Sequence, residues 1–131
     1  MTAIRERTVL FADLRGSTGL YESLGNAEAS GLVTQTVSQI SEAVLESGGH
    51  LIKTLGDGLM AAFETPRDGV RAAQRMQDML ERTVQRARRL NNPAMLALRL
   101  QVALARGEVV ELNGDCFGDA VNVAARLIDH A

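Results

Sequence analysis

The sequence predicts a single α+β domain whose strands and helices follow one another in the order βαββαβ. Three observations predict this order. Short apolar runs alternate with long segments in which apolar residues recur at helical spacing. A three-residue connection containing Gly-Asp joins two of the short runs, as in a β-hairpin. The length of 131 residues fits one domain with its own core.

The first half of the chain predicts a strand followed by a helical region. Residues 8–12 are nearly all apolar, which is typical of a strand in the centre of a sheet. Residues 18–46 have helical periodicity, with a glycine break at Gly25 that predicts a short helix and then a long one. Gly48 and Gly49 end the long helix. The apolar stripe of this helix consists of Val33, Val37, Ile40, Val44 and Leu45.

The second half predicts a hairpin, a helix and a further strand. Residues 50–54 and 58–63 pair as antiparallel strands, and 96–105 forms the next strand by alternation. The intervening helix starts near Pro66 and ends at Arg86, Arg88 and Arg89, where cations favour the helix dipole. Its predicted apolar stripe consists of Val70, Ala73, Met76, Leu80, Val84 and Ala87. A turn at Asn113 and Gly114 precedes a terminal helix at 119–130. This order describes a ferredoxin-like sandwich, an antiparallel sheet with both long helices on one face.

Two aspartates are placed to meet at one end of this sheet. Asp13 follows the first strand, and Asp57 lies at the tip of the hairpin. Magnesium prefers oxygen ligands and is usually held by one or two carboxylates together with substrate phosphates. Two simpler interpretations stay open, because Asp is a favoured helix N-cap residue and Gly-Asp-Gly is a common turn. Backbone N–H groups at the start of the following helix favour a phosphate there, and they belong to Arg15, Gly16, Ser17 and Thr18.

Three sequence blocks carry a resemblance to a known family. They read VLFADLRGSTGL at 9–20, GGHLIKTLGDGLMAAF at 48–63 and GDCFGDAVNVAARL at 114–127. In this order and spacing they resemble the signature blocks of the class III nucleotidyl cyclase catalytic domain, of the adenylate cyclase type. The blocks span the chain from Val9 to Leu127.

The resemblance implies a set of site residues. Asp13 and Asp57 match the two aspartates that bind two Mg²⁺ or Mn²⁺ ions, and Leu14 matches a residue whose carbonyl faces a metal. Lys53 and Asp115 match the pair that recognises adenine. The resemblance also implies a head-to-tail homodimer, in which one protomer gives the aspartates and the other gives the lysine and two catalytic residues. Asn122 matches the catalytic residue that orients the ribose, and Arg126 matches the one that stabilises the transition state.

The chemistry of these side chains supports the same assignments. Asn122 and Arg126 are four residues apart, so on a helix they share one face. A lysine donates to an adenine ring nitrogen and a carboxylate accepts from the exocyclic amine, whereas guanine reverses this pattern. Lys53 and Asp115 therefore favour ATP over GTP. An arginine suits the charge that develops on a phosphoryl centre.

The expected activity is conversion of ATP to 3′,5′-cyclic AMP and pyrophosphate by attack of the ribose 3′-oxygen on the α-phosphorus, assisted by two metals. Three alternatives stay open: a guanylate or other nucleotide cyclase, a catalytically silent nucleotide-binding or dimerisation module, and a diguanylate cyclase or polymerase-palm relative. The last lacks support because the hairpin reads LGDG rather than Gly-Gly followed by two acids. The chain also departs from the family at Ala105 and Arg106, where His and Thr are usual.

Composition sets limits on partners and location. A net charge of −2 and a pI near 5.7 give no electrostatic reason to expect nucleic acid or a membrane as partner. A single cysteine, Cys116, and the absence of an apolar run near the ~20 residues of a membrane span suit the cytoplasm. Residues 1–131 are expected to form one catalytic domain that lacks its usual C-terminal strands. A regulatory domain is expected, if present, after residue 131.

Overall fold

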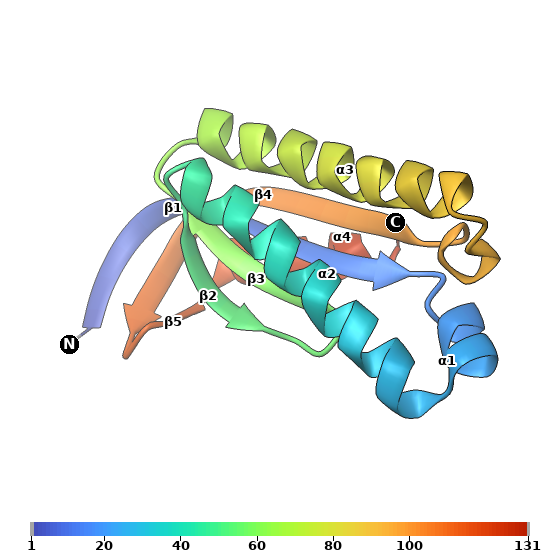
Figure 1. Ribbon diagram of the computed structural model, residues 1–131. Coiled ribbons are helices and arrows are strands. Elements are labelled where there is room, and N and C mark those ends of the chain that lie inside the picture. The colour runs from blue at the N-terminus through green and yellow to red at the C-terminus, as the bar shows by residue number, and fades with distance from the viewer. Residues whose placement is uncertain (1, 131) are drawn as a thin grey trace.

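The computed structural model describes residues 2–130 and has an α+β fold built on one five-stranded sheet (Figure 1). Four helices and a short 3₁₀ turn accompany the strands. None of the helices among residues 2–130 is long and apolar enough to cross a membrane. In chain order the elements are β1 (Thr2–Arg15), α1 (Thr18–Leu24), α2 (Asn26–Glu46), β2 (His50–Thr54), β3 (Gly58–Phe63), α3 (Pro66–Arg89), η1 (Pro93–Met95), β4 (Arg99–Leu112), β5 (Asp115–Phe117) and α4 (Asp119–Asp129).

The sheet is antiparallel, with strand order β2-β3-β1-β4-β5, so β1 lies in the centre as predicted. β1 pairs with β4 along its full length, from Thr2 opposite Leu112 to Arg15 opposite Arg99. On its other side β1 pairs with β3, and Asp13 lies opposite Gly58 in this register. This pairing brings the end of β1 to the tip of the β2–β3 hairpin.

The two faces of the sheet are covered by different helices. α2 and α3 cover one face, and α4 covers the other, as Figure 1 shows. Even-numbered β1 residues, such as Leu10 and Leu14, enter the larger core under α2 and α3. Odd-numbered residues such as Val9 enter the smaller core under α4. Burial on both faces explains why the middle of β1 is a continuous apolar run.

The helices and the hairpin confirm most of the predicted elements. Gly25 separates α1 from α2 with φ of +82°, a value that favours glycine. α3 begins at Pro66 behind the N-cap Thr65, whose side chain accepts a hydrogen bond from the N–H of Asp68 at 3.2 Å. The terminal helix also forms, at Asp119–Asp129.

The structure corrects the bounds of two strands, the segment after the last predicted turn, and the apolar stripes of the long helices. The first strand is Thr2–Arg15 rather than 8–12, and the strand predicted at 96–105 is Arg99–Leu112. The turn predicted at Asn113 and Gly114 forms, with positive φ at both residues, but it joins β4 to β5, a strand that the sequence pattern does not predict. Val70 of α3 and Leu45 of α2 do not join the buried stripes predicted for them, because 47% and 63% of their surfaces are exposed.

Candidate active site

The end of β1 brings the two predicted metal ligands together. The N–H of Leu14 donates to the carbonyl of Asp57 at 2.9 Å, which fixes the hairpin tip against β1. Gly58 permits this approach, because a Cβ at that position would lie 2.3 Å from the carbonyl oxygen of Ala12. The carboxyl groups of Asp13 and Asp57 lie close enough to interact, and the Asp57 carboxyl raises the pKa of Asp13.

This pair of carboxyl groups is electrostatically strained. Burial raises the pKa of Asp13, and the hydrogen bond and negative charge of Asp57 raise it further. Arg15 acts in the opposite direction, with its guanidinium 3.0 Å from Oδ2 of Asp13. Carboxylate oxygens that repel each other are a donor set that fits a divalent cation, since the cation removes the repulsion. Only two acids meet here: residues 2–130 contain no group of three or more His, Cys, Asp or Glu side chains suited to a metal ion.

The loop after β1 differs from the prediction in detail. Asp13, Leu14 and Arg15 belong to β1, so Asp13 is not the N-cap of the following helix. Ser17 occupies the N-cap position of α1, and its carbonyl accepts from the N–H of Leu20 at 2.9 Å. Of the four residues predicted to present backbone N–H groups, only Thr18 is in α1, and Ser17 and Gly16 form the connection.

The predicted adenine pair forms across the two edges of the sheet. Nζ of Lys53 on β2 lies 3.2 Å from Oδ2 of Asp115 on β5. Oδ1 of Asp115 accepts the backbone N–H of Cys116 at 2.8 Å. This hydrogen bond, followed by Lys53, lowers the pKa of Asp115. The pair therefore places a positive and a negative charge side by side without a ligand, and both side chains remain partly exposed to solvent.

The other two predicted residues project from α4. Ala120, Ala124 and Ile128 bury one side of this helix against the sheet, so Asn122 and Arg126 lie on its exposed side. Neither side chain makes a hydrogen bond or ion pair with another residue in 2–130. The structure therefore brings together Asp13 with Asp57 and Lys53 with Asp115, and it leaves Asn122 and Arg126 available to a ligand outside this chain.

A hollow of about 290 Å³ lies beside Asp13. Its walls include Ala125, Ile128 and Asp129 of α4, so the end of this helix reaches the surroundings of Asp13. The negative charge of Asp129 adds to the rise in the pKa of Asp13. Sequence reasoning missed Asp129, because only the packing of α4 on β1 shows that an acid at the end of that helix approaches Asp13.

A second hollow, of about 400 Å³, lies at the Lys53–Asp115 end of the sheet. Ile52 and Cys116 contribute apolar walls to it, Arg5, Glu111 and Asp115 contribute charged ones, and Lys53 does not line it. Burial raises the pKa of the Cys116 thiol, with the charges of Glu111 and Asp115 adding to the effect.

An antiparallel sheet with paired carboxylates at a strand end and a lysine–aspartate pair at its edges is the arrangement expected of a nucleotide cyclase catalytic domain. The sequence model of the Adenylate and Guanylate cyclase catalytic domain matches residues 1–131. The chain belongs to this family, and the resemblance of its three sequence blocks is confirmed.

Individual relatives agree with this assignment. An uncharacterized protein of Mycobacterium tuberculosis strain H37Rv is 38% identical over 120 residues, covering 90% of this chain and 28% of that protein. An adenylate cyclase of the same organism is 33% identical over 129 residues, covering 93% and 29%. The crystal structure of an adenylate/guanylate cyclase/hydrolase from Silicibacter pomeroyi has a TM-score of 0.77 and 31% identity, covering 100% of this chain and 73% of that one. The chain thus spans under a third of the length of these two mycobacterial relatives.

Proposed function

We propose that this chain is an adenylate cyclase domain that converts ATP to 3′,5′-cyclic AMP and pyrophosphate. The observation that carries the proposal is the Lys53–Asp115 pair, 3.2 Å apart at the edges of the sheet. In the reaction the ribose 3′-oxygen forms a bond to the α-phosphorus, the bond from that phosphorus to pyrophosphate breaks, and the 3′-hydroxyl proton leaves. Relatives named adenylate cyclase support this choice of substrate.

The base preference follows from hydrogen-bond chemistry. Lys53 donates to a ring nitrogen of adenine, and Asp115 accepts from the exocyclic amine. Guanine has an acceptor and a donor in the reverse positions, so each charged group would face a group of its own kind. A site built for one pattern discriminates strongly against the other, because the mismatch leaves polar groups unpaired.

Asp13 and Asp57 would hold Mg²⁺ or Mn²⁺, and the carbonyl of Leu14 would contribute beside them. When bound, two such ions lower the pKa of the attacking hydroxyl and stabilise the triphosphate charge. The repulsion that raises the pKa of Asp13 is relieved when the metals bind. In their absence Arg15 supplies the positive charge, 3.0 Å from Asp13.

The proposal includes a head-to-tail homodimer. Asn122 and Arg126 lie on the outer side of α4 and lack partners among residues 2–130, although the family places them on substrate. In the proposed dimer they meet the ATP held by the aspartates of the second protomer. Asn122 would orient the ribose, and Arg126 would stabilise the negative charge of the transition state.

The setting of the reaction is also a proposal. We place it in the cytoplasm, where the unpaired, buried Cys116 stays reduced. The proposal further treats residues 1–131 as one catalytic domain. An M. tuberculosis relative shares 28% of its length with the chain.

The test is a product assay. The purified chain is incubated with ATP or with GTP, in Mg²⁺ or Mn²⁺, and cyclic nucleotides are detected by mass spectrometry. We expect cyclic AMP from ATP, lost in Asp57→Ala and kept in Asp78→Ala, an exposed acid on α3 that serves as matched control. Cyclic GMP as the main product would show a guanylate cyclase. Nucleotide binding without product, repeated on a longer chain, would show a silent module.

A further inference from the structure

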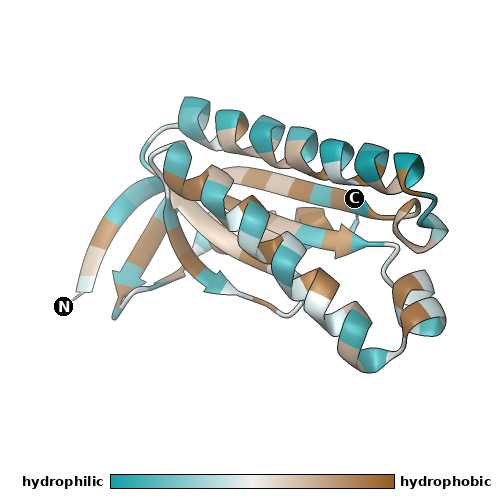
Figure 2. Ribbon diagram, in the orientation of Figure 1, coloured by the Kyte–Doolittle hydropathy of each residue, from teal (hydrophilic) through white to brown (hydrophobic). Residues whose placement is uncertain are grey.

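The outer surface of α3 carries an uneven share of the charge of the molecule. α3 holds seven of the fourteen basic residues, against three carboxylates, in a chain whose net charge is −2. Figure 2 shows the outer side of this helix as hydrophilic along its whole length. The proposed cyclase function uses none of these arginines, since α3 and α4 cover opposite faces of the sheet.

Five of the arginines form a stripe. At 100° per residue they fall within a sector of about 60° that runs the length of the helix. All five are exposed, and within residues 2–130 their only ion pair is between Arg75 and Glu46 of α2, at 2.6 Å. The stripe consists of Arg71, Arg75, Arg82, Arg86 and Arg89.

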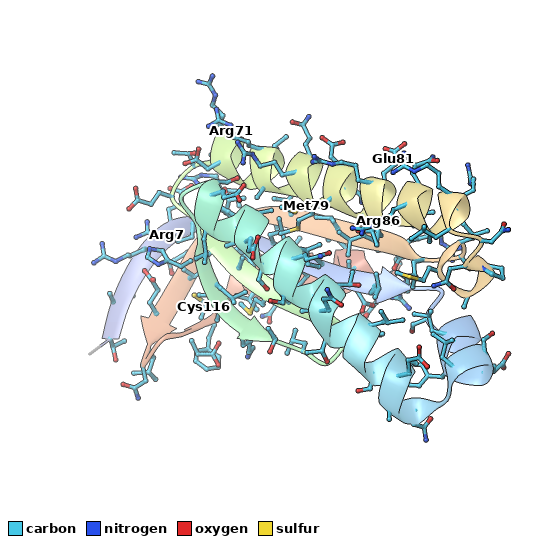
Figure 3. All side chains as sticks on the ribbon, viewed as in Figure 1. Arg7, Arg71, Met79, Glu81, Arg86 and Cys116 are labelled. Atoms are coloured by element: carbon cyan, nitrogen blue, oxygen red, sulfur yellow. The ribbon has the colours of Figure 1, made fainter. Side chains whose placement is uncertain are left out.

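A hollow of about 210 Å³ lies beside this stripe, in the groove between α2 and α3. Arg86 lines it, and in Figure 3 the Arg86 side chain lies between these two helices. Leu32 and Met95 give it apolar walls, whereas Gln35 and Gln39 of α2 give it polar ones. The groove thus contains a partly apolar hollow, and the arginine stripe runs along one side of it.

We propose that the groove between α2 and α3 binds an acidic peptide segment, with its carboxylates on the arginine stripe and one apolar side chain in the hollow. Arginine clusters recognise acidic motifs through charge-assisted hydrogen bonds, and apolar anchors fix the register of a segment in a groove. The segment supplies the negative charge that the stripe lacks within the described part of the chain.

A narrow segment fits this surface better than a membrane or nucleic acid. Carboxylates border the stripe on both sides, Asp78 and Glu81 on α3 and Glu42 on α2, all of them exposed. A flat anionic surface would meet these carboxylates as well as the arginines. Single-stranded nucleic acid stacks its bases on aromatic side chains, and none of the described residues that line the hollow is aromatic.

The experiment uses a synthetic fifteen-residue peptide with glutamates at helical i, i+4 and i+7 spacing around one leucine. Its affinity for the intact chain is measured by fluorescence anisotropy in low and high salt. Two further peptides replace all glutamates by glutamine, or the leucine by serine. Arg82→Glu with Arg86→Glu tests the stripe, and Arg88→Glu with Arg99→Glu is the matched control, since these exposed arginines lie outside the stripe.

We expect salt-sensitive binding that weakens roughly tenfold or more in the stripe variant and little in the control, because the double substitution removes two ion pairs and adds repulsion. Both altered peptides should bind more weakly. No binding at about 1 mM peptide, or equal losses in the two protein variants, would overturn the proposal. So would unchanged binding of either altered peptide. Binding of the chain to vesicles of phosphatidylcholine and phosphatidylserine but not to the peptide would overturn it as well, and would identify a membrane partner instead.

Discussion

Asp57→Asn is expected to stabilise the metal-free protein while removing its response to metal. Repulsion between two neighbouring carboxylates ranges from about 1 kcal/mol in water to about 4 kcal/mol at an effective dielectric constant of about 20. Arg15, 3.0 Å from Asp13, offsets much of this, and water screens the pair because 29% of the Asp13 side chain is exposed. The substitution keeps the Asp13–Arg15 pair and ends the repulsion. We expect the free energy of unfolding to rise by about 1 kcal/mol, which corresponds to a rise in Tm of about 4 °C.

Metal binding should make the wild type more stable than the Asp57→Asn variant. Mn²⁺ at about ten times its dissociation constant stabilises the wild type by about 1.4 kcal/mol, and the variant should gain much less. Thermal unfolding with and without Mn²⁺ measures both effects, with Asp78→Asn as a control expected to change stability by less than about 0.5 kcal/mol. A metal-free Tm of Asp57→Asn below that of the wild type, or an equal Mn²⁺ response, would refute the reasoning.

The pH dependence of the same comparison has a definite sign. Burial and Asp57 raise the pKa of Asp13 in the folded protein, so folding favours its protonated form. The contribution of Asp13 to stability is full below its unfolded pKa of about 4 and is lost as the pH rises through the folded value. The advantage of Asp57→Asn over the wild type should therefore grow between about pH 4 and pH 7.

Three further predictions follow from single contacts. Lys53→Glu with Asp115→Asn should lower cyclisation of ATP by at least about tenfold and raise that of GTP, as product assays would show; unchanged preference would remove the pair from base recognition. Because the Cys116 N–H and Lys53 lower the pKa of Asp115, its stabilising effect is lost as the pH falls. The Tm difference between wild type and Asp115→Asn should thus close below about pH 4, and a constant difference would contradict this. A Cβ at Gly16, where φ is +80°, would lie 2.1 Å from the Ala97 carbonyl oxygen. Gly16→Ala should therefore cost roughly 2–3 kcal/mol in chemical denaturation, against about zero for Gly19→Ala.

Local sequence patterns were sufficient for the helices and the central hairpin. The periodicity of α2 and α3, the break at Gly25 and the Gly-Asp connection all act within a few residues, so each can be read from the sequence. The proximity of Asp13 and Asp57 could also be predicted, because antiparallel β1 and β3 place Asp13 beside the hairpin tip.

The long ends of β1 and β4 depend on contacts between distant residues. Residues 2–7 are largely polar, and they form a strand because they pair with Gly107 to Leu112 of β4, where Arg5 and Arg7 also lie 3.1 and 3.7 Å from Glu111. No local pattern contains that pairing. β5 had a usable signal, since Asn-Gly is typical of a two-residue hairpin turn. That signal predicted a turn at Asn113 but not the strand that follows it.

Val70 is a residue that helical periodicity wrongly places in the buried stripe. The residue has the right spacing for the buried stripe, but Gly69 occupies the contact with β1 and Leu104 instead. A Cβ at Gly69 would lie 2.9 Å from Leu104 and 3.0 Å from Thr8. The helix packs too closely there for a side chain, and this closeness depends on the sheet beneath it.

The composite site is the central claim, and mixing two inactive variants tests it most directly. Asp57→Asn and Arg126→Ala should each abolish cyclic AMP formation alone. Mixed in equal amounts they should regain about one quarter of wild-type activity, because half of the random dimers are mixed and each has one intact site. Asp13→Asn mixed with Asp57→Asn should stay inactive, since both changes fall on the same side of the site. A first mixture no more active than its separate components would contradict the account.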